Sequence, residues 1–112
     1  MERKIFQFGR YFDQFLNKLP EKDRQKIDYV LSALKSVDRI SSKVVKYLTD
    51  GLYEIRIDCG NNIYRIFFMF DKENIIILFN GFKKKSQKTP HSELEKAIRI
   101  KKEYLSWKKK QC

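Results

Sequence analysis

The sequence predicts a single α+β domain, and three observations support this fold class. Apolar and polar residues alternate with a period of two through much of residues 51–82, which is typical of strands with one buried face. Apolar residues recur at helical spacing in residues 10–34 and again after Pro90. A chain of 112 residues can bury one core but not two independent ones, so we expect residues 1–112 to form one domain.

Residues 4–50 are expected to form a short strand and two helices. Lys4–Phe8 has strand character, and Gly9 separates it from a helix over Arg10–Leu19. Pro20 suits the start of a second helix, because proline is favoured at the first helical position and acids follow it in the first turn. We expect the two helices to form an antiparallel hairpin over the sheet, and residues 36–50 to form a polar connector.

Residues 51–70 are expected to form the first hairpin of a three-stranded antiparallel meander. If Gly60-Asn61 are the central residues of the turn, Arg56 lies directly opposite Arg65. The same register aligns one continuous apolar face, in which Tyr53, Ile55 and Ile57 lie opposite Phe68, Ile66 and Tyr64. Like charges directly opposite each other destabilise a sheet unless something neutralises them. We therefore expect an anion at the two arginines.

A second hairpin is predicted around Lys72-Glu73. Its register extends the apolar face onto a third strand, with Ile75, Ile77 and Phe79 opposite Phe70, Phe68 and Ile66. It also sets Asn80 beside Arg65, with Phe82 just beyond the strand end. A shift of one residue would move every side chain of this strand to the other face.

Thr89-Pro90 predict the start of a basic C-terminal helix over residues 90–109, with Thr89 as N-cap. The apolar side of this helix is formed by Leu94, Ala97, Ile98 and Leu105. We expect it to fold back over the second sheet face, on Phe67, Met69, Ile76 and Leu78. Otherwise a partner protein has to cover these residues.

Positive charge is concentrated near the C-terminus. The formal net charge is +11, and residues 81–112 hold 11 basic but only 3 acidic side chains. Such a concentration favours a polyanionic partner, because phosphate neutralisation supplies most of the sequence-independent affinity for nucleic acids. The alternative is that the charge serves only solubility.

The composition argues against several other classes of protein. Cys59 and Cys112 lack metal-like spacing and indicate a reducing, cytoplasmic setting. The first residues lack the apolar segment of a secretory signal, and no apolar run is long enough to span a bilayer. With His91 as the single histidine, we expect no metal site, no cofactor and no membrane partner.

The sheet face that carries Arg56, Arg65 and Asn80, next to Phe82 and Lys83 to Lys85, has the chemistry of an RNA site. Guanidinium groups bind a phosphodiester bidentately, and an aromatic ring stacks a base. RNA cleavage without a metal needs a base for the ribose 2′-hydroxyl, cations for the phosphorane charge and an acid for the 5′-oxygen. Arg65 fits the charge-stabilising role.

The base and the acid are open at this point. Glu54 lies on the right face, and one of Lys83 to Lys85 can act as base if neighbouring cations lower its pKa. His91 is a candidate acid, although a histidine in the first turn of a helix is more often a surface residue. The simpler alternative is that Arg56 and Arg65 only pair with acids such as Glu54.

Three segments of the chain resemble the RelE/ParE toxin superfamily, with the HigB-like branch and its phage-derived relatives the most similar. The segments are Gly51 to Ile57, Tyr64 to Phe68 and Gly81 to Pro90. The most specific part is the pattern Phe-Lys-Lys-x-x-x-Lys-Thr-Pro in the last segment. The order of elements matches the superfamily over nearly the whole chain, so the resemblance implies a RelE-like fold.

The resemblance implies the toxin of a type II toxin–antitoxin pair. Such a toxin is a ribosome-dependent, metal-independent endoribonuclease that cuts translated mRNA, inhibits translation and growth, and is silenced by a cognate antitoxin. Arg65 matches the arginine that binds the scissile phosphate, and Arg56 matches the preceding basic strand position. Lys83 and Lys84 match basic positions after the last strand. The wider RNA contacts are then expected from Asn80, Phe82, Lys85 and Lys88.

Two other functions remain open. Some relatives transfer a proton from a histidine or tyrosine where this chain has Phe82, which cannot do so, and the acid therefore stays unassigned. A ParE-like relative shares the fold but inhibits DNA gyrase by protein contact and cleaves no RNA. A non-catalytic nucleic-acid-binding module is the third possibility.

Overall fold

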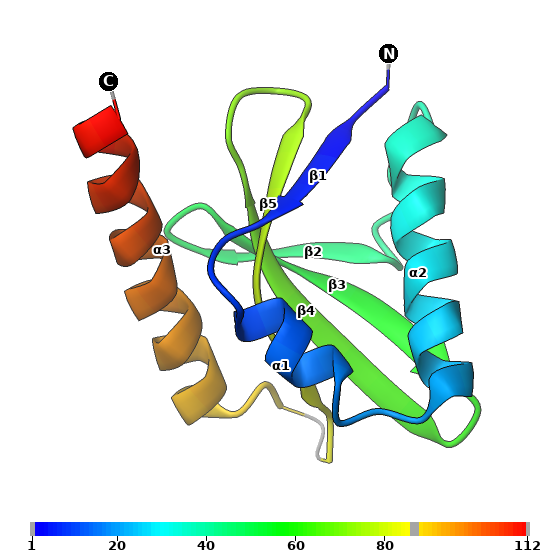
Figure 1. Ribbon diagram of the computed structural model, residues 1–112. Helices are drawn as coiled ribbons and strands as arrows, with labels where there is room; N and C mark the ends of the chain where they lie inside the picture. Colours follow the sequence, from blue (N-terminus) through cyan, green and yellow to red (C-terminus); the bar gives the residue numbers. More distant parts are fainter. Residues whose placement is uncertain (1, 86–87, 112) are drawn as a thin grey trace.

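A five-stranded sheet forms the centre of the protein in the computed structural model, which describes residues 2–85 and 88–111. The strand order is β1-β5-β4-β3-β2, with β1 parallel to β5 and all other pairs antiparallel. The strands are β1 (Lys4–Gln7), β2 (Val45–Thr49), β3 (Leu52–Cys59), β4 (Asn62–Phe70) and β5 (Ile75–Lys83) (Figure 1). Ser86 and Gln87 of the basic pattern, and Cys112, lie outside the described residues.

Three helices cover the two faces of the sheet. The first two are α1 (Tyr11–Leu16) and α2 (Glu21–Ser36), which pack on the face called here the α1/α2 face. The last is α3 (His91–Gln111), which packs on the opposite, α3 face. The predicted helical hairpin is wrong in one respect, because α1 packs on β5 whereas α2 packs on β3 and β1, so the two helices diverge (Figure 1). The α+β class and the order of the predicted elements are confirmed.

The segment predicted as a polar connector contains the edge strand β2, so that prediction is wrong. β2 pairs antiparallel with β3, but an irregularity between Tyr47 and Thr49 interrupts the register. This strand was not predicted because Tyr47 and Leu48 are adjacent in sequence, so its apolar residues do not alternate with a period of two. A tight turn then leads into β3 through Asp50 (φ 51°) and Gly51 (φ 78°), both left-handed.

The first hairpin has the predicted register. Gly60 takes a left-handed conformation (φ 62°) in the turn, and Arg56 lies directly opposite Arg65. The apolar pairs of the same register are also confirmed, namely Tyr53 with Phe68, Ile55 with Ile66 and Ile57 with Tyr64.

The second hairpin differs from the prediction by one residue. The Asp71 N–H donates to the Ile75 carbonyl (2.7 Å), and this pair closes a loop of the three residues between them. Lys72 in this loop is left-handed (φ 68°). Phe70 therefore pairs with Ile76, and Phe68 with Leu78. The predicted two-residue turn is wrong because a third residue can enter the loop when Lys72 accepts a positive φ.

A bulge in the middle of this hairpin shifts the register once more. Between Ile66 and Phe68 the pairing slips by one residue, so Ile66 pairs with Gly81 and Arg65 pairs with Phe82. Asn80 is therefore not the partner of Arg65, and Phe82 lies within β5 instead of beyond its end.

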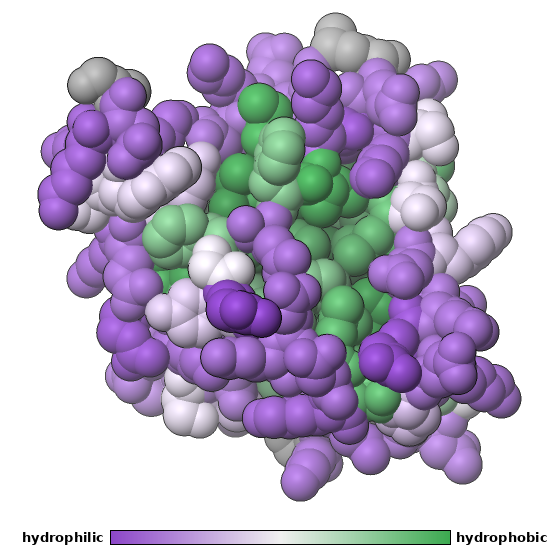
Figure 2. All heavy atoms as spheres, viewed as in Figure 1, coloured by the Kyte–Doolittle hydropathy of each residue, from purple (hydrophilic) through white to green (hydrophobic). Residues whose placement is uncertain are grey.

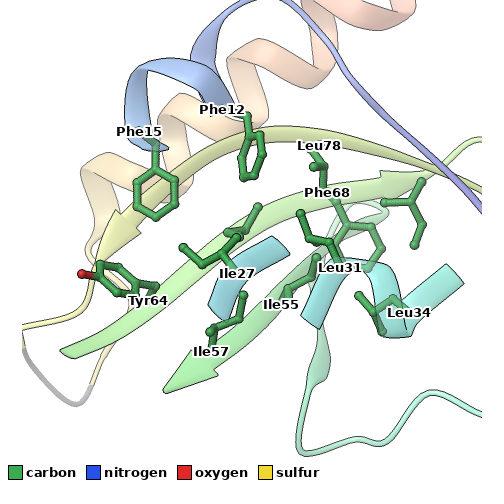
Figure 3. Close-up of a cluster of buried hydrophobic side chains, with 12 residues drawn as sticks. Phe12, Phe15, Ile27, Leu31, Leu34, Ile55, Ile57, Tyr64, Phe68 and Leu78 are labelled. Carbon is green, nitrogen blue, oxygen red and sulfur yellow. The ribbon is translucent and has the colours of Figure 1, made fainter. Parts of the chain in front are cut away.

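The α1/α2 face carries the larger apolar core. Phe12 and Phe15 from α1, with Ile27, Leu31 and Leu34 from α2, cover the sheet side chains Ile55, Ile57, Tyr64, Phe68 and Leu78 (Figure 3). Part of this core is open to view between β1, α1 and α2 (Figure 2), where a pocket of about 400 Å³ is lined by Ile5, Phe12, Leu31 and Leu78, among others.

The second core lies under α3, as predicted, but with different members from β5. Buried residues of this core are Leu52, Phe67, Met69, Ile77, Phe79, Phe82, Ala97, Ile100 and Tyr104. Ile76 and Leu78, predicted here, point to the α1/α2 face because of the three-residue loop. All four residues expected on the second sheet face are buried, so they offer no apolar surface to a partner.

The helix α3 begins at His91, one residue later than predicted, and the Pro90 carbonyl accepts from the N–H groups of Glu93 and Leu94. It continues to Gln111, beyond the predicted end. Within the described residues, no helix is long and apolar enough to cross a membrane.

Close approach of α1 to β5 requires glycine at position 81. A Cβ atom there would lie 2.6 Å from Cδ2 of Phe15. We expect Gly81→Ala to lower the free energy of unfolding by about 1–3 kcal/mol through overpacking, measured by denaturant unfolding. In a double-mutant cycle, Phe15→Leu should recover part of this loss. Strictly additive effects would contradict the proposed contact.

Candidate functional site

Arg56 and Arg65 lie side by side on the α3 face. The register of β3 and β4 makes them direct cross-strand neighbours. Arg65 is buried (7% exposed), whereas one third of the Arg56 side chain is accessible. Burial lowers the pKa of the Arg65 guanidinium, and the charge of Glu54 opposes this effect. The pair is therefore a concentrated positive charge at the end of a hairpin.

One carboxylate is shared between the two arginines. Glu54 is almost fully buried (2% exposed), and its Oε1 lies 3.5 Å from Arg56 Nε and 3.9 Å from Arg65 Nε. Its other oxygen accepts a hydrogen bond from the hydroxyl of Thr89 (3.4 Å), the residue predicted as N-cap of the terminal helix. Glu54 thus holds both guanidinium groups and the segment that leads into α3.

The shared carboxylate leaves donor capacity unused. Arg56 Nε and Arg65 Nε are buried and have no hydrogen-bond partner among the described residues. Both atoms face Glu54, so the ion pairs lack the geometry of strong charge-assisted hydrogen bonds. The arrangement has two cations for one anion, and this excess positive charge makes it suited to bind a phosphate group.

Lys84 is the lysine of the basic run that joins this cluster. Its backbone N–H extends the β4–β5 ladder by donating to the Ile63 carbonyl (2.7 Å). Because Phe82 is the partner of Arg65, alternation places Lys84 on the same face as the two arginines. Partial burial, followed by the positive charges of Arg65 and Arg56, lowers the pKa of the Lys84 ammonium.

Three further lysines, which were not predicted from the sequence, border the site. Lys46 is the cross-strand partner of Glu54, so the edge strand β2 brings it to the same face. A pocket of about 370 Å³ at the edge of β3 is lined by Arg56 and Arg65 together with Lys26 and Lys43. All three lysines are brought near by the tertiary fold, because residues 45–49 lack a clear period-two pattern and Lys26 and Lys43 are distant in sequence from the arginines.

The remaining predicted residues lie elsewhere. Phe82 is buried and stacks on Phe67 (centroids 5.6 Å apart, planes at 28°), so it is not the exposed stacking ring that was predicted. Asn80, Lys83 and Lys85 line a different pocket beyond β5. Lys88 is exposed on the segment before α3.

His91 is exposed on the first turn of α3, where its Nε2 lies 2.8 Å from Oε1 of Glu95. Among residues 2–85 and 88–111, no three histidine, cysteine or acidic side chains gather in a way that could hold a metal ion.

We expect Glu54→Gln to destabilise the domain by about 2 kcal/mol, because removal of the shared anion leaves two adjacent buried or half-buried cations uncompensated. Sulfate at fixed ionic strength should restore more stability to the variant than to the wild type, since it can take the place of the carboxylate. Denaturant unfolding with and without sulfate measures both effects. Glu95→Gln, which removes an exposed acid, is the matched control and should change little. Equal stability of Glu54→Gln and wild type would contradict the role of Glu54 as counter-ion.

Comparisons with known proteins agree with this architecture. Residues 14–102 match the family described as Phage derived protein Gp49-like. A chain of the archaeal RelE-RelB complex from Pyrococcus horikoshii OT3 is similar in structure, with a TM-score of 0.52 and 15% sequence identity, over 72% of this chain and 93% of that chain. The comparison with curated proteins gives no match. The chain therefore belongs to the Phage derived protein Gp49-like family, and its fold is RelE-like.

Proposed function

We propose that the chain is the toxin of a type II toxin–antitoxin system and that it cleaves translated mRNA without a metal ion. The observation that carries this proposal is the cluster of Arg56, Arg65 and Lys84 around the single buried carboxylate of Glu54. Such a cluster can bind a phosphodiester and stabilise the charge that develops on a phosphorane. The Gp49-like family and the RelE-like fold are consistent with it.

In the proposed reaction, the neutral amine of Lys84 takes the proton of the ribose 2′-hydroxyl. The 2′-oxygen then bonds to the neighbouring phosphorus while the bond to the 5′-oxygen breaks, which leaves a 2′,3′-cyclic phosphate. The released 5′-oxygen takes a proton from water, because the Phe82 ring has none to give. Arg65 and Arg56 bind the non-bridging oxygens throughout.

Glu54 is better suited as a counter-ion than as the base. Both of its oxygens are engaged, one by the two arginines and one by Thr89, and its side chain is almost inaccessible. Lys84 is more accessible, and its lowered pKa increases the fraction of neutral amine near neutral pH. Lys83 faces away from the cluster, so we assign it to substrate binding.

We place the chain in the HigB-like branch on its basic pattern after β5. In the archaeal relative, RelE is found in a complex with RelB. By analogy we propose a cognate antitoxin as partner, for which the net charge of +11 favours acidic segments. The ribosome and its mRNA are the proposed target, in the cytoplasm.

Arg65→Ala should reduce mRNA cleavage by about 10²-fold or more, because it removes a donor to the transition state. The measurement is a map of new mRNA 5′ ends shortly after the chain is induced in a bacterial host. Arg99→Ala removes an exposed arginine of α3 and should leave the map unchanged. Circular dichroism of the purified variants checks that both retain the fold.

Each other function predicts a different result in the same experiment. Growth arrest with intact mRNA would point to a ParE-like gyrase inhibitor. Neither arrest nor new 5′ ends would leave a nucleic-acid-binding module without catalysis. An Arg65→Ala variant as active as wild type would contradict the assigned role of the arginine cluster.

A second prediction concerns pH. Since the reaction needs neutral Lys84, the cleavage rate on programmed ribosomes should rise with pH as the ammonium loses its proton. The pKa of Lys84 is lower than that of a free lysine, so the rise should begin at lower pH than an unperturbed lysine would allow. Lys84→Arg should abolish the rise and most of the rate, whereas Lys102→Arg, on the exposed side of α3, should change neither. A pH-independent wild-type rate would exclude Lys84 as base.

A further inference from the structure

A second positively charged pocket lies on the other side of the β5 strand end from the arginine cluster. It has a volume of about 410 Å³ and is enclosed by α1, the end of β5 and the first turns of α3, which come together in the lower part of Figure 1. Four lysines line it, namely Lys18, Lys83, Lys85 and Lys96, against the single carboxylate of Glu93. Its charge therefore favours an anionic ligand.

The basic run after β5 is divided between the two sites. Lys84 lies with the arginines, whereas Lys83 and Lys85, its neighbours in sequence, line the second pocket. Phe82 is the cross-strand partner of Arg65 and also lines this pocket. The two sites thus lie on opposite sides of the same strand end and share the residues that connect them, so one RNA strand that passes this end can contact both.

The oxygen of a buried amide in this pocket has no hydrogen-bond donor. Asn80 is 2% exposed, and its Nδ2 faces two acceptors, the carbonyl of Glu93 (3.3 Å) and Oε1 of the same residue (3.4 Å). These contacts fix the orientation of the amide. Its Oδ1 is buried and has no hydrogen-bond partner among the described residues. A ligand that donates an N–H group would satisfy this oxygen.

Aromatic side chains form part of the wall. Tyr11, Phe15 and Phe82 all line the pocket, but Phe15 and Phe82 are buried, so Tyr11 is the ring that a ligand can reach. Planar bases pack favourably on an aromatic ring, and every base carries N–H donors on its Watson–Crick edge. An acidic peptide would satisfy the lysines but would bring no planar group to Tyr11.

We propose that this pocket binds the nucleotide next to the scissile phosphate. The base donates an N–H group to Asn80 Oδ1, and its phosphate is contacted by lysines at the rim, chiefly Lys83 and Lys85. This inference rests on the proposed RNA-cleaving function, and it replaces the general RNA contact expected of Asn80 with recognition of a base in a defined pocket.

The test is binding of a single-stranded 2′-O-methyl RNA, which cannot be cleaved, compared with an abasic strand of the same length. Fluorescence anisotropy at low salt should show roughly 10-fold tighter binding of the strand with bases by the wild type. Asn80→Leu keeps a similar volume but removes the acceptor, and should reduce that ratio towards one. Binding of the abasic strand should be unaffected by this change.

A surface variant keeps the test valid if Asn80→Leu fails to fold. Lys18→Ala with Lys85→Ala should weaken binding of both strands and reduce the salt dependence by about one to two released counterions. Lys102→Ala with Lys109→Ala removes two exposed lysines elsewhere on α3 and is the matched control. Thermal unfolding of all variants confirms that each retains the fold.

The outcomes separate this inference from the proposed function. If Arg65→Ala abolishes mRNA cleavage while Asn80→Leu leaves the ratio between base-containing and abasic strands unchanged, and the two lysine substitutions weaken neither strand, the nuclease stands and the subsite is wrong. If the ratio depends on Asn80 but no cleavage occurs, the subsite stands and the nuclease is wrong. If the wild-type protein binds a polyglutamate peptide that RNA displaces, and the strands with and without bases displace it equally well, the pocket is a protein-docking site and the inference is overturned.

Discussion

The carboxylate of Glu54 is the contact on which the site depends. Two arginines on neighbouring strands would repel each other, and the sheet tolerates them because one buried anion lies between them. The same carboxylate accepts a hydrogen bond from the hydroxyl of Thr89 and so connects the segment before α3 to the centre of the sheet. The opposed charges, their counter-ion and the covering helix therefore form one unit, in which positive charge remains in excess.

The β-bulge between Ile66 and Phe68 decides which lysine belongs to this unit. If the register of the β4–β5 loop continued without it, Gly81 would lie opposite Arg65, and Lys83 would point to the α3 face. The bulge moves Phe82 to that position, so Lys84 joins the arginines and Lys83 faces the other way. Three adjacent lysines thereby serve two sites. Bulges next to functional sites often re-aim a side chain in this way.

The residues that line the second pocket come from several different elements. Lys18 comes from the segment after α1, Asn80 and Lys83 from β5, and Lys96 from α3. The small Gly81 lets the Phe15 ring lie against β5, which brings α1 close to this strand. The pocket is thus a product of helix packing on both faces of one strand end, and the fold alone does not fix what it binds.

The sequence by itself determined the α+β class, the first hairpin and the pairing of Arg56 with Arg65, because these follow from local turn chemistry and period-two alternation. It did not determine the β4–β5 register, since a three-residue loop and a two-residue loop fit the residues Asp71 to Asn74 equally well. Only the tertiary structure showed β2 with Lys46, the burial of Phe82 and the separation of Lys83 from Lys84. These features depend on strands and helices that are distant in sequence, whose contacts no local pattern encodes.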